Sequence, residues 1–371
     1  MSAMAAEYGA LNLSQGFPNF EIDPLLSQLV NQAMNDGFNQ YAPMPGHLAL
    51  RERISEKVAA AHGKKYDPGT EITVTAGATQ AIYTAISALV HSGDEVIVFA
   101  PAYDCYEPAI QLQGAISVPI QLKPPLYQVD WDEVRATITP KTSMIIINSP
   151  HNPSGMVFSE ADMLELQDIA EHHDLLVLSD EVYEHIIFDD LTHQSAARFP
   201  ELAKRSIITA SFGKTFHATG WKMGYCLAPE PYMEEFRKVH QYLVFSVNHP
   251  VQRAMATYLE TPAHYLTLGK FYQQKRDRFL SFVKDTPFKV IPSQGTYFQL
   301  LDYSAISKEN DIDFARRLTI DHGLAAIPTS VFNENRENHF MLRFCFAKID
   351  STLEQAGNIL KRLQAEISHH P

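Results

Sequence analysis

SMIIIN at 143–148 is the stretch that decides the fold class. Its four central residues are apolar and three of them are β-branched, which is typical of a strand buried on both faces of a sheet. LLVLS at 175–179 and SIITA at 206–210 are further runs of this kind, and helix-type segments separate them. Strands that alternate with helices predict an α/β protein with a mostly parallel sheet covered by helices.

The same alternation extends in both directions along the chain. Upstream, EVIVFA at 95–100 is a strand-type run, and the apolar spacing over 79–90 predicts a helix. Downstream, MGYCLA at 223–228 is interpreted as another strand, with a helix following over about 231–242. The sheet is therefore expected to include strands well beyond the three central runs.

The pattern changes after about residue 260, where a basic helix-type stretch leads to further strand-type runs at 295–301 and 341–346. A chain of 371 residues is also too long for one compact core. We therefore expect three parts: a segment 1–23 that packs with the C-terminal part, a large domain 24–260 and a small α+β domain 261–371.

Composition narrows the class of protein. Apolar residues make up 45% and charged residues 20% of the chain, as in ordinary globular proteins. The net charge of -13 argues against nucleic acid, because affinity for nucleic acid comes from Lys and Arg that neutralise phosphates. No apolar run approaches the length of a membrane span.

Targeting and redox signals point to the cytoplasm. The first Lys or Arg is Arg51, so neither a secretory signal nor a transit peptide is expected. The three cysteines are far apart and form no C-x-x-C pair, which favours free thiols in a reducing compartment.

Reactive polar residues follow three successive strand-type runs. Asn152 follows the run at 143–148, Asp180 and Tyr183 follow the next run, and Ser211 and Lys214 follow the third. Taken singly, such residues are most often caps, turns or solvated side chains. Ligands of open parallel sheets bind at the carboxyl ends of the strands, so these residues are expected to converge on one crevice.

The segment SFGKTFHATGWKMG at 211–224 resembles the cofactor-lysine motif of class I aminotransferases, the fold-type-I pyridoxal phosphate enzymes. Four other blocks resemble that family in order and approximate spacing: NLSQGFPNF (12–20), NSPHNPSG (148–155), SDEVYEH (179–185) and MLRFCFA (341–347). The resemblance covers essentially the whole chain, and is strongest to the branch with bacterial methionine aminotransferases and the kynurenine and glutamine transaminases. It implies a seven-stranded-type sheet in a large cofactor-binding domain.

The resemblance implies pyridoxal 5'-phosphate as the cofactor and Lys214 as the catalytic residue, which carries the cofactor as a Schiff base. A lysine amine is nucleophilic only when deprotonated, and burial beside other cations favours that form. Asp180 would hold the protonated pyridine nitrogen. Tyr183 and Asn152 would hydrogen-bond the phenolic oxygen of the ring, and Tyr103 would stack on the ring face.

The phosphate of the cofactor needs backbone donors and fixed charges. The run Thr75–Thr79 is expected to open a helix, whose first N–H groups form an anion site around Gly77, Ala78 and Thr79. By resemblance, Ser211 and Lys222 supply side-chain contacts, although many family members carry Arg at the position of Lys222. Tyr41 matches a tyrosine that reaches the phosphate from the neighbouring subunit, which implies a homodimer with shared sites.

On the substrate side, the resemblance implies that Arg343 binds the α-carboxylate of the amino acid as a two-pronged partner, aided by Gly16 and Asn152. Phe17, Tyr103 and Phe245 suggest an aromatic-walled pocket, with a residue near Phe245 contributed by the partner subunit. No second basic residue for a distal carboxylate is evident in the pocket segments. Methionine and aromatic amino acids are therefore the expected donors.

The sequence lacks the motifs of several other classes of protein. A P-loop would need Gly five positions before Gly213, where the chain has Ile208. His172 and His173 are adjacent, so they point to different sides of a helix, and no metal site is expected. Kynurenine–oxoglutarate transamination and β-elimination from cysteine conjugates or cystathionine remain open, since the cofactor residues would be shared.

Two features concern the N-terminus. Only about a dozen residues precede the block at 12–20, whereas family members usually have a longer arm that packs on the other subunit. The same short start leaves no room for an attached DNA-binding module, so a ligand-sensing regulator is not expected.

Overall fold

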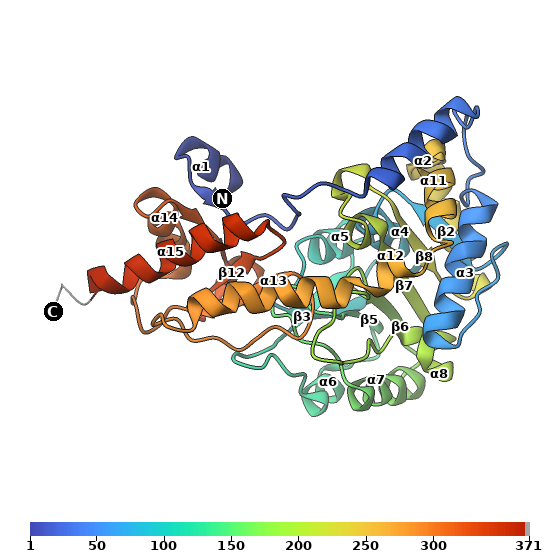
Figure 1. Cartoon of the computed structure of the whole chain (residues 1–371). Coiled ribbons are helices and arrows are strands. Elements are labelled where there is room, and N and C mark those ends of the chain that lie inside the picture. The colour runs from blue at the N-terminus through green and yellow to red at the C-terminus, as the bar shows by residue number, and fades with distance from the viewer. Residues whose placement is uncertain (368–371) are drawn as a thin grey trace.

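A seven-stranded sheet forms the centre of the protein (Figure 1). The computed structural model describes the backbone of residues 1–367 and the side chains of residues 1–363. The strands of this sheet lie in the order Ile72–Thr75 (β2), Gly224–Leu227 (β8), Ser206–Ser211 (β7), Leu176–Asp180 (β6), Thr142–Asn148 (β5), Glu95–Ala100 (β3) and Ile116–Gln121 (β4). Strands β3 to β7 pair in parallel, which confirms the mostly parallel sheet.

Two strands differ from the sequence expectation. The run at 223–228 does form a strand, β8, but it pairs antiparallel with both neighbours, so that Gly224 lies opposite Ser211 of β7. The segment between β7 and β8 stays at the carboxyl end of β7. Strand β8 therefore begins where β7 ends and runs in the opposite direction. Strand β4 was not expected at all, because Pro119 interrupts its run; proline is tolerated there because β4 is an edge strand.

Helices cover both faces of the sheet because alternate residues of each strand point to opposite sides. Met144 and Ile146 of β5 belong to one apolar cluster, whereas Ile145 and Ile147 belong to another. The first cluster is completed by Ala78–Leu89 (α4), Tyr106–Leu112 (α5) and Glu230–Leu243 (α10). The second is completed by helices including Glu160–His172 (α7), Leu48–His62 (α3) and His249–Tyr258 (α11).

Seven further elements complete this part of the chain. They are Pro24–Asn35 (α2), Trp131–Thr137 (α6), Ala196–Arg198 (η1), Pro200–Ala203 (α8), Phe212–Thr215 (α9), Thr219–Trp221 (η2) and Ala263–Leu266 (α12). Helix α2 packs on α11 at the end of the molecule far from the C-terminus (Figure 1).

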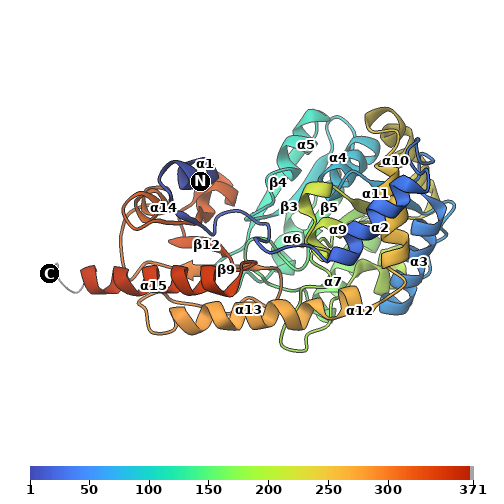
Figure 2. The same ribbon diagram turned by 45° about the horizontal axis from the view of Figure 1, so that its top comes forward.

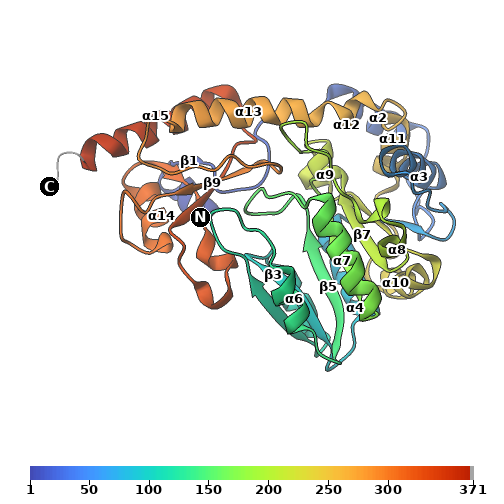
Figure 3. The ribbon, with the colours of Figure 1, turned by 90° about the horizontal axis from the view of Figure 1, so that it is seen from below.

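The remaining residues form a smaller α+β body beside the sheet. Its three-stranded antiparallel sheet has the order Ile327–Pro328 (β11), Met341–Cys345 (β12) and Phe298–Asp302 (β9). The long helix Leu268–Val283 (α13) runs from α12 toward this body and lies beside Asp350–Ile367 (α15), as Figures 2 and 3 show. The other elements are Asp311–Ile320 (α14), Thr329–Phe332 (η3) and Glu334–Arg336 (η4).

The first residues of the chain join this smaller body. Leu11–Asn12 (β1) pairs in parallel with Leu324–Ala325 (β10), and the helix Ser2–Glu7 (α1) contacts α14. Strands β1 and β10 are more than 300 residues apart in sequence, so only the tertiary structure brings them together. Within the described residues, no helix is both long and apolar enough to span a membrane.

Candidate active site

The carboxyl ends of β5, β6 and β7 open into a cavity of about 490 Å³. Residues from the start of α4, from segment 14–17 and from the smaller body complete its wall. Most of the residues expected to form the site line this cavity: Gly16, Phe17, Gly77, Ala78, Thr79, Tyr103, Asn152, Asp180, Tyr183, Ser211, Lys214, Lys222 and Arg343. The tertiary structure therefore brings together groups from distant parts of the sequence.

Lys214 lies on α9, a single helical turn that follows β7 directly. The Ser211 hydroxyl accepts the backbone N–H of Lys214, which fixes the turn and aims the side chain into the cavity. Its Nζ donates to the Gly16 carbonyl at 3.3 Å and lies 5.5 Å from the ring centre of Tyr297. Burial, with help from the positive charge of Arg343, lowers the pKa of Lys214 to about 8, so the amine is partly unprotonated near neutral pH.

Asp180 ends β6 and is buried on the floor of the cavity. The Tyr106 hydroxyl donates to its Oδ2 at 2.5 Å, and the Asn148 amide donates to its backbone carbonyl at 2.9 Å. Burial raises the pKa of Asp180 to about 6, and the bond from Tyr106 opposes that rise. The carboxylate thus needs a cationic partner in the cavity, which a protonated ring nitrogen would supply.

Arg343 lies on β12 and reaches the cavity from the smaller body. Its Nη1 donates to Asn152 Oδ1 at 2.7 Å, and Nη2 donates to the Ser14 carbonyl at 3.3 Å. The ring of Phe298 lies 4.0 Å from the guanidinium carbon. Nε has no partner among the described residues, and burial lowers the pKa of Arg343. A buried guanidinium with an unfilled donor suits a carboxylate ligand.

The phosphate end of the expected cofactor has a matching cradle at the start of α4. Gly77 caps this helix with φ +80°, and a Cβ there would lie 3.3 Å from Nζ of Lys222. A Cβ on Gly224 would lie 3.0 Å from the Ala78 backbone nitrogen, so both glycines leave room for a close approach. The Thr79 hydroxyl bonds the Tyr103 hydroxyl at 3.2 Å. Helix N–H groups, a lysine and hydroxyls at one place fit a phosphate.

Two of the expected residues lie outside the cavity. Tyr41 is 80% exposed and Phe245 is 45% exposed, and their rings pack edge to face with centres 5.3 Å apart. Tyr41 was expected to act at the site of a neighbouring subunit, and its position on the surface of one chain agrees with that expectation without testing it. Phe245 was expected to wall the substrate pocket, but it does not line this cavity in the single chain.

The motifs did not identify every residue that supports or lines the cavity. Tyr106 does not line it but holds the Asp180 carboxylate from behind, and its spacing of three from Tyr103 could have suggested a shared direction. Asn148, the last residue of β5, accepts the backbone N–H of Asn152 at 2.8 Å and so shapes the turn that carries that residue. Ile327 and Phe332 line the substrate side, but no sequence motif marks them.

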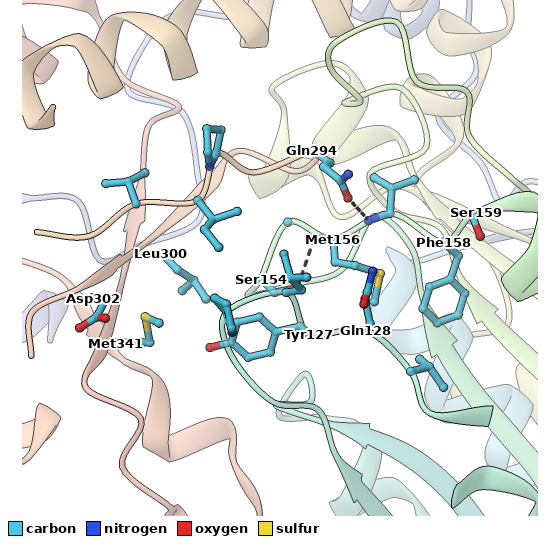
Figure 4. A pocket seen from close by; sticks show the side chains of 18 of the residues that line it. Tyr127, Gln128, Ser154, Met156, Phe158, Ser159, Gln294, Leu300, Asp302 and Met341 are labelled. Carbon is cyan, nitrogen blue, oxygen red and sulfur yellow. Dashed lines mark hydrogen bonds between the residues drawn. The ribbon is translucent and has the colours of Figure 1, made fainter. Parts of the chain in front are cut away.

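A second, larger cavity of about 740 Å³ lies elsewhere, between the turn around Tyr127, the segment 154–159 and the smaller body (Figure 4). Tyr127, Met156 and Leu300 face it, and the Gln294 side chain accepts the backbone N–H of Val157 at its rim. None of the expected site residues lines it, and it lacks a buried amine such as that of Lys214. The smaller cavity is therefore the candidate active site.

Known proteins resemble this chain over nearly its whole length. Residues 9–361 match the family model described as "Aminotransferase class I and II". The chain is 49% identical to methionine aminotransferase of Escherichia coli (strain K12), over 98% of this chain and 94% of that relative. It is 34% identical to a kynurenine–oxoglutarate transaminase of Dictyostelium discoideum, over 98% of this chain and 93% of the relative. An Escherichia coli crystal structure reported with a methionine aminotransferase function matches with a TM-score of 0.96 at 48% identity, covering 97% and 96% of the two chains.

Proposed function

The chain belongs to the class I and II aminotransferase family, and on that premise we propose that it moves the amino group of methionine, and of aromatic amino acids, to a 2-oxo acid. The reaction would use pyridoxal 5'-phosphate and proceed in two half-reactions, with the amino donor leaving as a 2-oxo acid before the acceptor binds.

The observation that carries this proposal is that the Lys214 amine lines one cavity together with a buried carboxylate, Asp180, and a buried guanidinium, Arg343. An amine with a pKa of about 8 in such a cavity can act as a nucleophile and as a proton carrier at neutral pH.

Pyridoxal 5'-phosphate, when bound, supplies an aldehyde that reacts with amines and a ring that accepts the electron pair of the broken Cα–H bond. The chain supplies the rest. The Asp180 carboxylate would accept a hydrogen bond from the ring nitrogen and favour its protonated form. Backbone N–H groups at the start of α4, with Ser211 and Lys222, would hold the phosphate.

Substrate orientation comes from the smaller body. The Arg343 guanidinium binds the α-carboxylate, with the Asn152 amide beside it, and this fixes which bond at Cα faces the Lys214 amine. Nζ of Lys214 would take the proton from Cα and carry it to the aldehyde carbon of the cofactor. Positioned proton transfer of this kind contributes about 10²–10⁴-fold to rate.

Methionine and aromatic side chains are supported by two observations and one physical argument. Phe17, Tyr103 and Phe332 line the cavity that Arg343 also lines, and Ile327 adds a further apolar side chain. The relative of 49% identity is a methionine aminotransferase. Sulfur and aromatic rings attract one another, so aromatic walls favour a thioether as well as a phenyl group.

We further propose a homodimer with shared active sites. Tyr41 and Phe245 form an exposed aromatic pair, and exposed aromatic side chains are enriched at interfaces between subunits. The cysteines Cys105, Cys226 and Cys345 are all free thiols, which supports a reducing compartment, the cytoplasm.

Assays of the purified protein test the proposed reaction. We expect methionine and phenylalanine to be converted faster than aspartate, and only when a 2-oxo acid acceptor is present. Lys214→Ala should lose this activity and the absorption band of the lysine-bound cofactor, whereas Lys204→Ala, at an exposed lysine, should keep both. Pyruvate or a thiol released from cystathionine or a cysteine conjugate in the absence of a 2-oxo acid acceptor would instead indicate a β-lyase. Faster conversion of aspartate than of methionine and phenylalanine would refute the argument from the pocket.

A further inference from the structure

The substrate side of the cavity is closed by a segment that crosses from the smaller body to the edge of the large sheet. This segment is η3, Asn333 and η4. Phe332, the last residue of η3, lines the cavity, and its ring centre lies 5.2 Å from the guanidinium carbon of Arg343. Phe332 therefore forms part of the cavity wall beside the group expected to hold the ligand's carboxylate.

The crossing segment is fastened to the smaller body. The Asp311 carboxylate, at the start of α14, accepts the backbone N–H and the hydroxyl of Ser330, at 2.7 and 2.6 Å. The Asn333 amide donates to the Glu337 carbonyl at 2.7 Å. These bonds shape the segment, but they do not connect it to the large sheet.

Gln121 makes that connection. It is the last residue of the edge strand β4, and its side chain binds on two sides. Toward the large sheet, Nε2 donates to the carbonyls of Ala100 and Leu122 at 3.2 and 2.9 Å. Toward the smaller body, Nε2 faces Asn333 Oδ1 at 3.3 Å, and Oε1 accepts the backbone N–H of Glu334 at 2.9 Å.

A backbone contact lies next to this side chain. The N–H of Ala102, the residue before Tyr103, donates to the Phe332 carbonyl at 2.9 Å. Gln121 and Ala102 together hold Phe332 opposite Tyr103, which lines the same cavity. Of these two connections, only the one through Gln121 depends on a side chain.

We propose that Gln121 is a positioning residue for the substrate pocket: by tying Asn333 and Glu334 to the edge of the large sheet, it holds Phe332 as the wall against which the substrate side chain packs. This inference rests on the proposed function, since it assumes a carboxylate ligand at Arg343. Gln121 acts through Phe332, so it affects ligands long enough to reach that ring and leaves short ones unaffected.

Binding of an unreactive ligand tests the proposal without relying on turnover. 4-(Methylthio)butyrate has the carbon skeleton of methionine but no amino group, and propionate has the carboxylate alone with a short tail. Their dissociation constants would be measured by calorimetry on the cofactor-loaded protein and on its Gln121→Ala, Phe332→Ala and double variants. Gln111→Ala, at an exposed glutamine of α5, is the matched control.

Gln121→Ala should weaken 4-(methylthio)butyrate about 3- to 10-fold, the size expected for losing one or two neutral hydrogen bonds that order a wall. Propionate should bind unchanged. Phe332→Ala should weaken the binding of 4-(methylthio)butyrate at least as much as Gln121→Ala does. The double variant should bind this ligand no more weakly than Phe332→Ala. In turnover assays, KM for methionine should rise while kcat and the KM for alanine stay constant.

The proposal would be overturned if the losses in binding free energy caused by Gln121→Ala and Phe332→Ala added up in the double variant. It would also be overturned if Gln121→Ala weakened the binding of propionate as much as that of 4-(methylthio)butyrate. Gln121→Glu keeps the acceptor for Glu334 but sets a carboxylate oxygen against the Ala100 and Leu122 carbonyls and Asn333 Oδ1, so it should weaken the binding of 4-(methylthio)butyrate at least as much as Gln121→Ala. This variant decides the question if Gln121→Ala does not fold. A wild-type protein that binds 4-(methylthio)butyrate but does not transaminate methionine would refute the proposed function and leave the binding test intact.

Discussion

The pH dependence of cofactor capture follows directly from the burial of Lys214. Only the free amine reacts with the aldehyde, and the pKa of this amine is about 8 because burial disfavours its cation. For a lysine in water, with a pKa near 10.5, the free fraction at pH 7 is roughly 0.03%, whereas at a pKa of about 8 it is roughly 10%. The buried site therefore holds about 300 times more reactive amine at neutral pH.

The assay is the rate at which protein freed of cofactor binds added pyridoxal 5'-phosphate, followed by the absorption band of the lysine-bound form between pH 6 and 9.5. The rate should rise about tenfold from pH 6 to 7 and level off above pH 8, since the amine is increasingly unprotonated as pH rises through its pKa.

A variant sharpens this test. Arg343 is a positive neighbour that lowers the pKa of Lys214, so Arg343→Gln should move the midpoint of the curve to higher pH. Arg316→Gln, at an exposed arginine of α14, should leave the midpoint in place. A rate that is flat across this range, or that is still rising steeply at pH 9.5, would refute the assignment of a burial-lowered pKa to this amine.

Three further substitutions probe the site and its support. Asp180→Asn should retain cofactor but lower kcat roughly 10²-fold or more, because a neutral amide no longer stabilises a protonated ring nitrogen; an unchanged kcat would contradict that role. Arg343→Lys should lower kcat/KM for methionine about 10- to 100-fold, mainly through KM, since an ammonium cannot replace a two-pronged guanidinium. Lys57→Met should lower the free energy of unfolding, measured with urea, by about 3–5 kcal/mol, because Lys57 Nζ lies 2.7 Å from the carboxylate of Glu184 and that buried charge would lose its partner. Arg53→Met, on the exposed side of α3, should change this free energy little.

The strands at the centre of the sheet were predictable because their own residues specify them. β5 and β7 are short apolar runs, as expected of strands buried on both faces of a sheet. Helices lie in the sequence between β5, β6 and β7, which indicates that these strands are parallel. β4 was not predictable from its residues, since Pro119 weakens the strand pattern and only its place at the edge of the sheet makes it tolerable. The direction of β8 could not be predicted from its residues either, because it depends on the path of the segment that joins it to β7.

For the site, local sequence indicates which groups converge on the cavity, since Asp180, Ser211 and Lys214 lie at or just after the carboxyl ends of their strands and parallel strands end at one edge of the sheet. What surrounds these groups follows from tertiary contacts. The bond from Tyr106 to Asp180 and the link from Gln121 to Asn333 each join residues 70 or more positions apart. The Nε of Arg343, which has no partner among the described residues, is buried by contacts that no local pattern encodes. Local sequence fixes local conformation, whereas contacts and desolvation are properties of the folded chain as a whole.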